Sequence, residues 1–148
     1  MESGFTSVWN RVTGACPAED EQTKLRRWIR DEAQSIRAYE TFLRAAQTKP
    51  VNTMLRQVLW EKKRRLKRLQ TMYFLRTGDT FAVSLPQEGK PLSFLHGLRD
   101  QYAVELTQAE CYRQAASAGG DLSEVCALLA EENRNTAAGL RSLAERLL

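Results

Sequence analysis

Apolar residues recur at spacings of three and four along four long stretches of the chain, which is the period of an α-helix. These stretches cover about residues 18–47, 51–76, 91–117 and 121–148. Only a few residues separate the first stretch from the second and the third from the fourth, so each pair is predicted to form an antiparallel hairpin. The long connection over residues 78–90 favours an all-α four-helix bundle with a crossover between the second and third helices.

The residues between these stretches are of the kinds found at helix ends. Pro50 precedes the second stretch, and Gly78 follows it. Two glycines at 119–120 separate the third stretch from the fourth. Asp121 is predicted to cap the fourth helix, and Glu124 is predicted to reach back and complete a capping box.

Residues 1–17 are predicted to form a segment of their own, packed on the bundle formed by residues 18–148. The apolar residues of this segment have helical spacing and are Phe5, Val8, Trp9 and Val12. We therefore expect a short amphipathic helix that covers the edge of the core, with a partner-binding peptide as the alternative.

The composition narrows the class of protein. The chain has 148 residues, of which 43% are hydrophobic and 27% charged, as is usual for a soluble globular domain. Its net charge of +4 permits an anionic partner without requiring one. We expect no signal peptide, because the N-terminus lacks a basic start, a continuous apolar segment and a cleavage site. We expect no membrane partner, because no stretch reaches the ~18 apolar residues that a membrane-spanning helix needs.

The cysteines and the histidine lack the spacing of a zinc site or of a disulfide framework. The cysteines are Cys16, Cys111 and Cys126, and the single histidine is His96. Reduced thiols in a cytoplasmic protein are the simplest interpretation.

Polar residues interrupt the apolar face of every predicted helix near its middle. These positions are Glu32, Lys62, Arg65, Glu105, Asn133 and Thr136. A buried charge is costly unless it has a partner. The pattern therefore predicts either a site inside the bundle or a set of internal ion pairs.

The two halves of the chain share a pattern. Glu32 is followed seven residues later by Tyr39, and Glu105 is followed seven residues later by Tyr112. Seven residues are about two helical turns, so each glutamate shares a face with its tyrosine. The other helix of each half carries two of the polar positions, three residues apart. The pattern indicates a duplicated helical hairpin.

This pattern resembles the rubrerythrin branch of the ferritin-like superfamily, whose members carry a Glu on one helix and Glu-x-x-His on the next, and then repeat the pair. Residues 32–39 are similar to the family's first helix, 105–112 to its third, and 61–78 to its second helix and the following turn. The resemblance covers about residues 20–148. It implies a ferritin-like bundle, a di-metal centre in its core and self-association, with a homodimer as the expected form.

The family's ligand positions carry different residues in this chain. When the motifs are aligned by the apolar face of each helix, the two Glu-x-x-His motifs fall on Lys62 with Arg65 and on Asn133 with Thr136. Neither motif keeps its glutamate or its histidine.

A second frame, shifted by one residue, restores both glutamates but lies off the apolar face. This frame uses Glu61 with Arg64 and Glu132 with Asn135, and it supplies no histidine. The frame on the apolar face is therefore preferred.

We hypothesise that Lys62 and Arg65 replace the charge of the metals. They would form buried salt bridges with the two glutamates of the apolar faces, with Tyr39 and Tyr112 as hydrogen-bond partners. Such a cluster would balance charge without a metal, and its fixed cations would repel iron or manganese. The predicted function is therefore a structural, binding or regulatory role in a homo-oligomer, without a cofactor and without catalysis.

Two alternatives stay open. Glu32 and Glu105 would suit a metal-dependent oxidoreductase or peroxide-handling protein with unusual ligands. Residues 62–68 include six basic residues in seven and would suit nucleic-acid or anion binding. We do not favour nucleic acid, because no recognised motif or interleaved aromatic surface accompanies them. Trp28 and Trp60 are expected to anchor the core or an interface between subunits.

Overall fold

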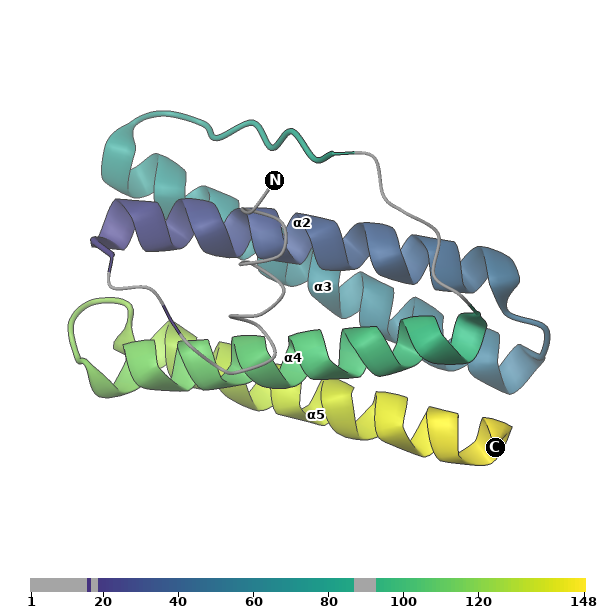
Figure 1. Ribbon diagram of the computed structural model, residues 1–148. Coiled ribbons are helices and arrows are strands. Elements are labelled where there is room, and N and C mark those ends of the chain that lie inside the picture. The colour runs from purple at the N-terminus through teal and green to yellow at the C-terminus, as the bar shows by residue number, and fades with distance from the viewer. Residues whose placement is uncertain (1–15, 17–18, 87–92) are drawn as a thin grey trace. The chain divides into compact units, whose positions relative to one another are not determined.

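The computed structural model describes residues 16, 19–86 and 93–148. Within these residues the chain is all-α, with four helices and no strand (Figure 1). The helices are α2 (Glu21–Ala45), α3 (Lys49–Thr77), α4 (Phe94–Ser117) and α5 (Ser123–Leu147). This confirms the predicted all-α class with four helices. The amphipathic helix predicted over residues 1–17 lies outside the described residues, apart from Cys16.

The chain divides into two compact units. One is Ala18–Phe94, which contains α2 and α3, and the other combines Met1–Pro17 with Leu95–Leu148 and so contains α4 and α5. Each unit is described by itself below. The crossover between them and the closure of one bundle remain predictions.

Local hydrogen bonds and a glycine set the ends of α2 and α3. The Asp20 carboxylate accepts from the Thr23 backbone amide at 2.8 Å, and the Thr48 hydroxyl accepts from the Val51 amide at 3.4 Å. Such bonds satisfy backbone donors that have no partner inside the helix. Gly78 ends α3 with a φ of 79°, a left-handed conformation that glycine adopts without steric cost.

Helices α2 and α3 pack against each other as an antiparallel hairpin. The first turn of α2 meets the last turn of α3, where Arg76 Nη1 lies 2.6 Å from Glu21 Oε1. One turn further along α2, Arg26 donates to the Tyr73 hydroxyl at 3.2 Å. The hairpin predicted from the short connection is therefore confirmed. Fully buried apolar side chains of this unit include Leu25, Ile29, Leu55 and Leu69.

The described part of the long connection lies along the α2–α3 hairpin. Phe81 packs on Tyr73, with ring centroids 5.8 Å apart, and the Arg30 guanidinium lies 5.7 Å from the Phe81 ring centre. Arg37 also donates to the Pro86 carbonyl. These contacts fix residues 81–86 to α2 and α3.

Helices α4 and α5 form the second hairpin. Asn133 on α5 donates to Gln108 on α4 at 3.2 Å. Gly119 and Gly120, with φ of 80° and 91°, form the turn between the helices. Leu122, at the end of this turn, is buried.

The predicted N-cap residue of α5 is wrong. Helix α5 begins at Ser123, and its N-cap residue is Leu122, whose side chain makes no capping hydrogen bond. Burial of Leu122 places that residue, rather than Asp121, at the cap position. The Ser123 hydroxyl instead donates to the Ala116 carbonyl at 2.6 Å and so ties the end of α4 to the start of α5.

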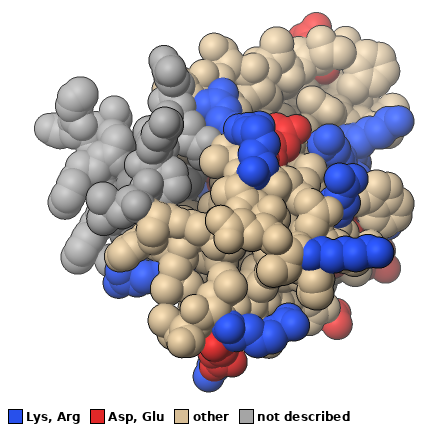
Figure 2. Space-filling model, turned by 90° about the vertical axis from the view of Figure 1, so that its right-hand side faces the viewer, with Lys and Arg blue, Asp and Glu red and all other residues tan. Residues whose placement is uncertain are grey.

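The two units differ in charge. Residues 18–94 contain 16 Lys and Arg against nine Asp and Glu, whereas the rest of the chain contains six against nine. On the face drawn in Figure 2, Lys and Arg side chains are dispersed among uncharged residues.

Of the helices that the structure describes, none has the length and apolar character needed to cross a membrane.

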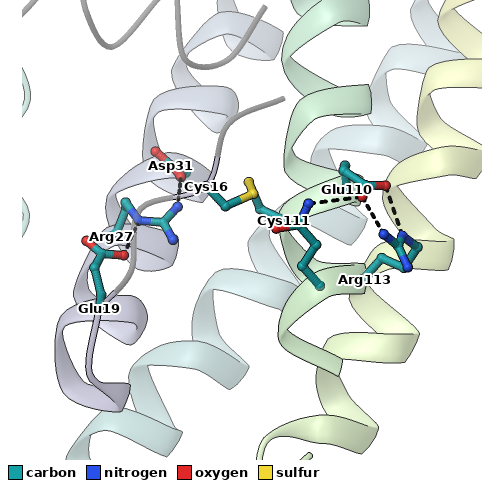
Figure 3. Close-up of a disulfide and its surroundings, with 8 residues drawn as sticks. Cys16, Glu19, Arg27, Asp31, Glu110, Cys111 and Arg113 are labelled. Atoms are coloured by element: carbon teal, nitrogen blue, oxygen red, sulfur yellow. Dashed lines mark hydrogen bonds and ion pairs between the residues drawn. A yellow bond between two sulfur atoms is a disulfide. The ribbon is translucent and has the colours of Figure 1, made fainter. Parts of the chain in front are cut away.

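A disulfide links Cys16 to Cys111 on α4, 95 residues further along the chain (Figure 3). The prediction that these two thiols are reduced is therefore wrong. An odd number of cysteines without a motif gave no sign that these two residues meet in space. Cys126 lies outside the disulfide and is buried. The prediction of a cytoplasmic location rests on reduced thiols, and the disulfide removes that support. The location stays a prediction.

Candidate functional site

All the polar residues predicted to face inward are buried. Glu32, Lys62, Glu105 and Asn133 have no exposed surface, and Arg65, Thr136, Tyr39 and Tyr112 are nearly as deeply buried. The residues of the second frame lie off the buried face, as predicted, since Arg64 and Asn135 are exposed and Glu61 and Glu132 are only partly buried. The period of the apolar residues therefore located these positions correctly.

In the α2–α3 hairpin, Glu32 and Lys62 form an ion pair away from solvent. Lys62 Nζ lies 3.5 Å from Glu32 Oε1, and both side chains are fully buried. The hairpin register places them opposite each other, because α2 runs antiparallel to α3 from the Glu21–Arg76 contact onward. The pairing predicted for these two residues is present.

Two further predicted residues lie inside the same hairpin. Arg65 is buried one helical turn beyond Lys62, on the same face of α3. The Tyr39 ring is fully buried and packs edge-on against Phe42, with centroids 5.6 Å apart. The interior of this hairpin therefore holds two cationic side chains and one carboxylate.

The α4–α5 hairpin holds a carboxylate among neutral amides. Gln101 donates to Glu105 Oε2 at 3.0 Å, and Asn133 donates to Gln108 Oε1 at 3.2 Å. Thr136 donates within α5 to the Glu132 carbonyl at 3.0 Å. Sequence reasoning missed Gln101 and Gln108, although their offsets of four and three residues from Glu105 place them on its face of the helix.

The two hairpins thus share one pattern with different chemistry. Each buries a glutamate and, two turns later, a tyrosine, as the predicted duplication implies. Only the α2–α3 hairpin buries cations beside its glutamate. A cluster that joins Glu105 to Lys62 and Arg65 would span the two units, and it stays a prediction.

The side chains at these positions do not fit a di-metal centre. Such centres in helical bundles take a glutamate from each of two helices and Glu-x-x-His from each of the other two. Here the four motif positions carry an ammonium, a guanidinium, an amide and a hydroxyl. Where the structure describes side chains, no three or more His, Cys, Asp and Glu side chains gather as metal ligands.

The side chains of the basic stretch, residues 62–68, lie on two different faces of α3. Lys62 and Arg65 face inward, whereas Lys63, Arg64 and Lys67 are exposed. Trp60 is also exposed, so a core role for it is wrong, while Trp28 is buried as predicted. The Arg64 guanidinium lies 4.9 Å from the Trp60 ring centre and covers one side of the ring.

Comparison of the chain with protein-family models, curated proteins and solved structures finds no match. The resemblance to ferritin-like proteins therefore rests on the spacing of residues in this chain. The fold and the site define an all-α protein with buried polar residues in each helical hairpin.

Proposed function

We propose that this protein is a non-catalytic relative of the rubrerythrin branch, in which a protein ion pair replaces the di-metal centre. The observation that carries the proposal is the Glu32–Lys62 pair, with 3.5 Å between Nζ and Oε1 and no exposed surface on either side chain. The protein acts as a structural, binding or regulatory module, without a cofactor.

Charge balance supports this function. In a di-metal bundle, the carboxylates offset the charge of two cations. If the cations are removed, a buried carboxylate must take up a proton or find another positive partner. Lys62 supplies that partner in the α2–α3 hairpin. Arg65 adds a second fixed positive charge on the same buried face, which opposes entry of a metal ion.

The α4–α5 hairpin supports the same function in another way. Its glutamate, Glu105, accepts a hydrogen bond from Gln101, a neutral donor. Asn133, at a family ligand position, uses its amide to bond Gln108. The first of these bonds lies within α4, and the second links α5 to α4 at a position where the family carries a metal ligand.

The effect of metal ions on thermal unfolding tests this proposal. A metal that binds only the folded chain stabilises it, by about 2.7 kcal/mol at a concentration 100 times its dissociation constant. We expect the same unfolding midpoint in chelator, in Mn²⁺ and in anaerobic Fe²⁺.

A matched pair of variants identifies the source of any shift. Glu32→Gln removes a buried carboxylate, and Glu110→Gln removes a partly exposed one on α4. A metal-dependent rise in the midpoint that disappears in Glu32→Gln and persists in Glu110→Gln would contradict the proposal. It would support the metal-dependent oxidoreductase instead.

A further inference from the structure

Helix α3 exposes an aromatic side chain between two cations. Arg56, Trp60 and Arg64 are all exposed, and Trp60 keeps 55% of its surface. Their spacing of four residues places them along one face of the helix. Lys63 and Lys67 lie beside this face, and the whole of α3 carries nine basic residues against one carboxylate, Glu61. We call Arg56, Trp60 and Arg64 the basic face.

Helix α5 carries the same arrangement with the opposite charge. Glu124, Leu128 and Glu132 also follow one another at intervals of four residues. Leu128 keeps 43% of its surface, and Glu124 is exposed. Glu131 adds a further exposed carboxylate, and no Lys or Arg occurs over residues 121–133. We call Glu124, Leu128 and Glu132 the acidic face.

We propose that the basic face of one chain binds the acidic face of a second copy. On both helices, charged residues lie about 6 Å of helix rise to each side of an exposed apolar side chain. Opposed helices can therefore bury Trp60 against Leu128 while their charges pair at both ends. The charges of the whole units act in the same direction, since α3 belongs to the basic unit and α5 to the acidic one.

The contact joins two different surfaces of the chain. Two basic faces placed together would repel each other, so α3 does not pair with α3. The proposed α3–α5 contact is therefore heterologous, because it joins the basic face of one copy to the acidic face of another. This proposal goes beyond the proposed function and does not depend on metal content.

Charge reversal with analytical ultracentrifugation tests the proposal on the full-length chain. One variant is Arg56→Glu with Arg64→Glu, and the other is Glu124→Arg with Glu132→Arg. We expect the wild type to dimerise, and to dimerise less at about 0.5 M salt than at about 0.05 M. Each variant alone should dimerise at least about tenfold more weakly, because its two faces now have like charge.

Mixing the two variants distinguishes lost complementarity from damaged folding. In the mixture the acidic α3 of one variant meets the basic α5 of the other, so a mixed dimer should form. Trp60→Ala should weaken wild-type dimerisation without any change in charge. Arg141→Glu, at an exposed position outside the acidic face, is the control and should leave it unchanged.

Four results would overturn the proposal. The first is a wild-type chain that stays monomeric at every concentration. The second is a dimer that both reversals leave intact. The third is a pair of reversal variants that fail to form a mixed dimer although each is folded by circular dichroism. The fourth is a monomer that binds a single-stranded oligonucleotide through Trp60, which would assign the basic face to nucleic acid.

Discussion

The Lys62 ammonium lies 3.5 Å from a carboxylate oxygen of Glu32, and neither side chain reaches solvent. A buried ion pair differs from an exposed one in how strongly the loss of a partner affects the stability of the fold. Removal of one partner from a buried pair leaves an uncompensated charge, whereas replacement of both by apolar residues is often tolerated. The α2–α3 hairpin therefore depends on the two residues being present together.

Lys62→Met should lower the free energy of unfolding by about 3–5 kcal/mol, because it leaves the Glu32 carboxylate buried without its ammonium. Glu32→Leu should have a similar effect. The double variant should lose much less than the sum of the two single losses. Urea denaturation of all four proteins measures these differences, and additive losses would contradict a coupled pair.

Asn133→Ala should destabilise the protein by about 1–3 kcal/mol, because it leaves the Gln108 oxygen without the amide donor that it has in the interior. Asn135→Ala on the same helix is the control. Asn135 is exposed, and its loss should change stability by less than about 0.5 kcal/mol. Equal losses of unfolding free energy for the two substitutions, measured by urea denaturation, would contradict a stabilising role of the buried hydrogen bond.

The disulfide predicts the number of thiols in the protein. The chain contains three cysteines, and Cys16 and Cys111 are joined. Protein purified without reductant and then unfolded should react with one equivalent of a thiol reagent, through Cys126, and with three after reduction. Three equivalents without reduction would contradict the disulfide.

Glu110 should titrate far below an ordinary glutamate. Hydrogen bonds from Arg113 and then Gln114 lower its pKa from 4.5 to about 2. Because the folded-state pKa is lowered, the contribution of this carboxylate to stability is complete above pH 4.5 and disappears as the pH falls through about 2. Carbon-detected NMR titration measures the midpoint, and Arg113→Ala should move it upward. A wild-type midpoint near 4.5 would contradict the contact (Figure 3).

The sequence located the buried polar residues because burial follows helical period. Glu32 and Lys62 interrupt apolar faces at positions where the spacing of three and four continues on both sides, so their burial could be predicted. Pairing between them followed from charge alone. The interpretation of these positions as a former metal site rests on the resemblance to a metal-binding family. The helical fold does not test that interpretation.

Other features depend on distances that a sequence does not contain. Cys16 and Cys111 are 95 residues apart and lack any motif, so their disulfide could not be foreseen. The start of α5 was misplaced because a capping signal at Asp121 competes with burial of Leu122, and burial prevails. Residue type left Trp60 as an anchor of either the core or a subunit interface, and its position on α3 outside the apolar face excludes the core.

Elemental mass spectrometry gives the most direct test of the claim that a protein ion pair replaces the metal centre. The purified protein is measured before and after incubation with ferrous iron and with manganese, followed by removal of unbound metal. The account predicts no stoichiometric metal in any sample. About one or two metal ions per chain, as in single-metal and di-metal sites, lost on substitution of Glu32 or Glu105, would contradict it.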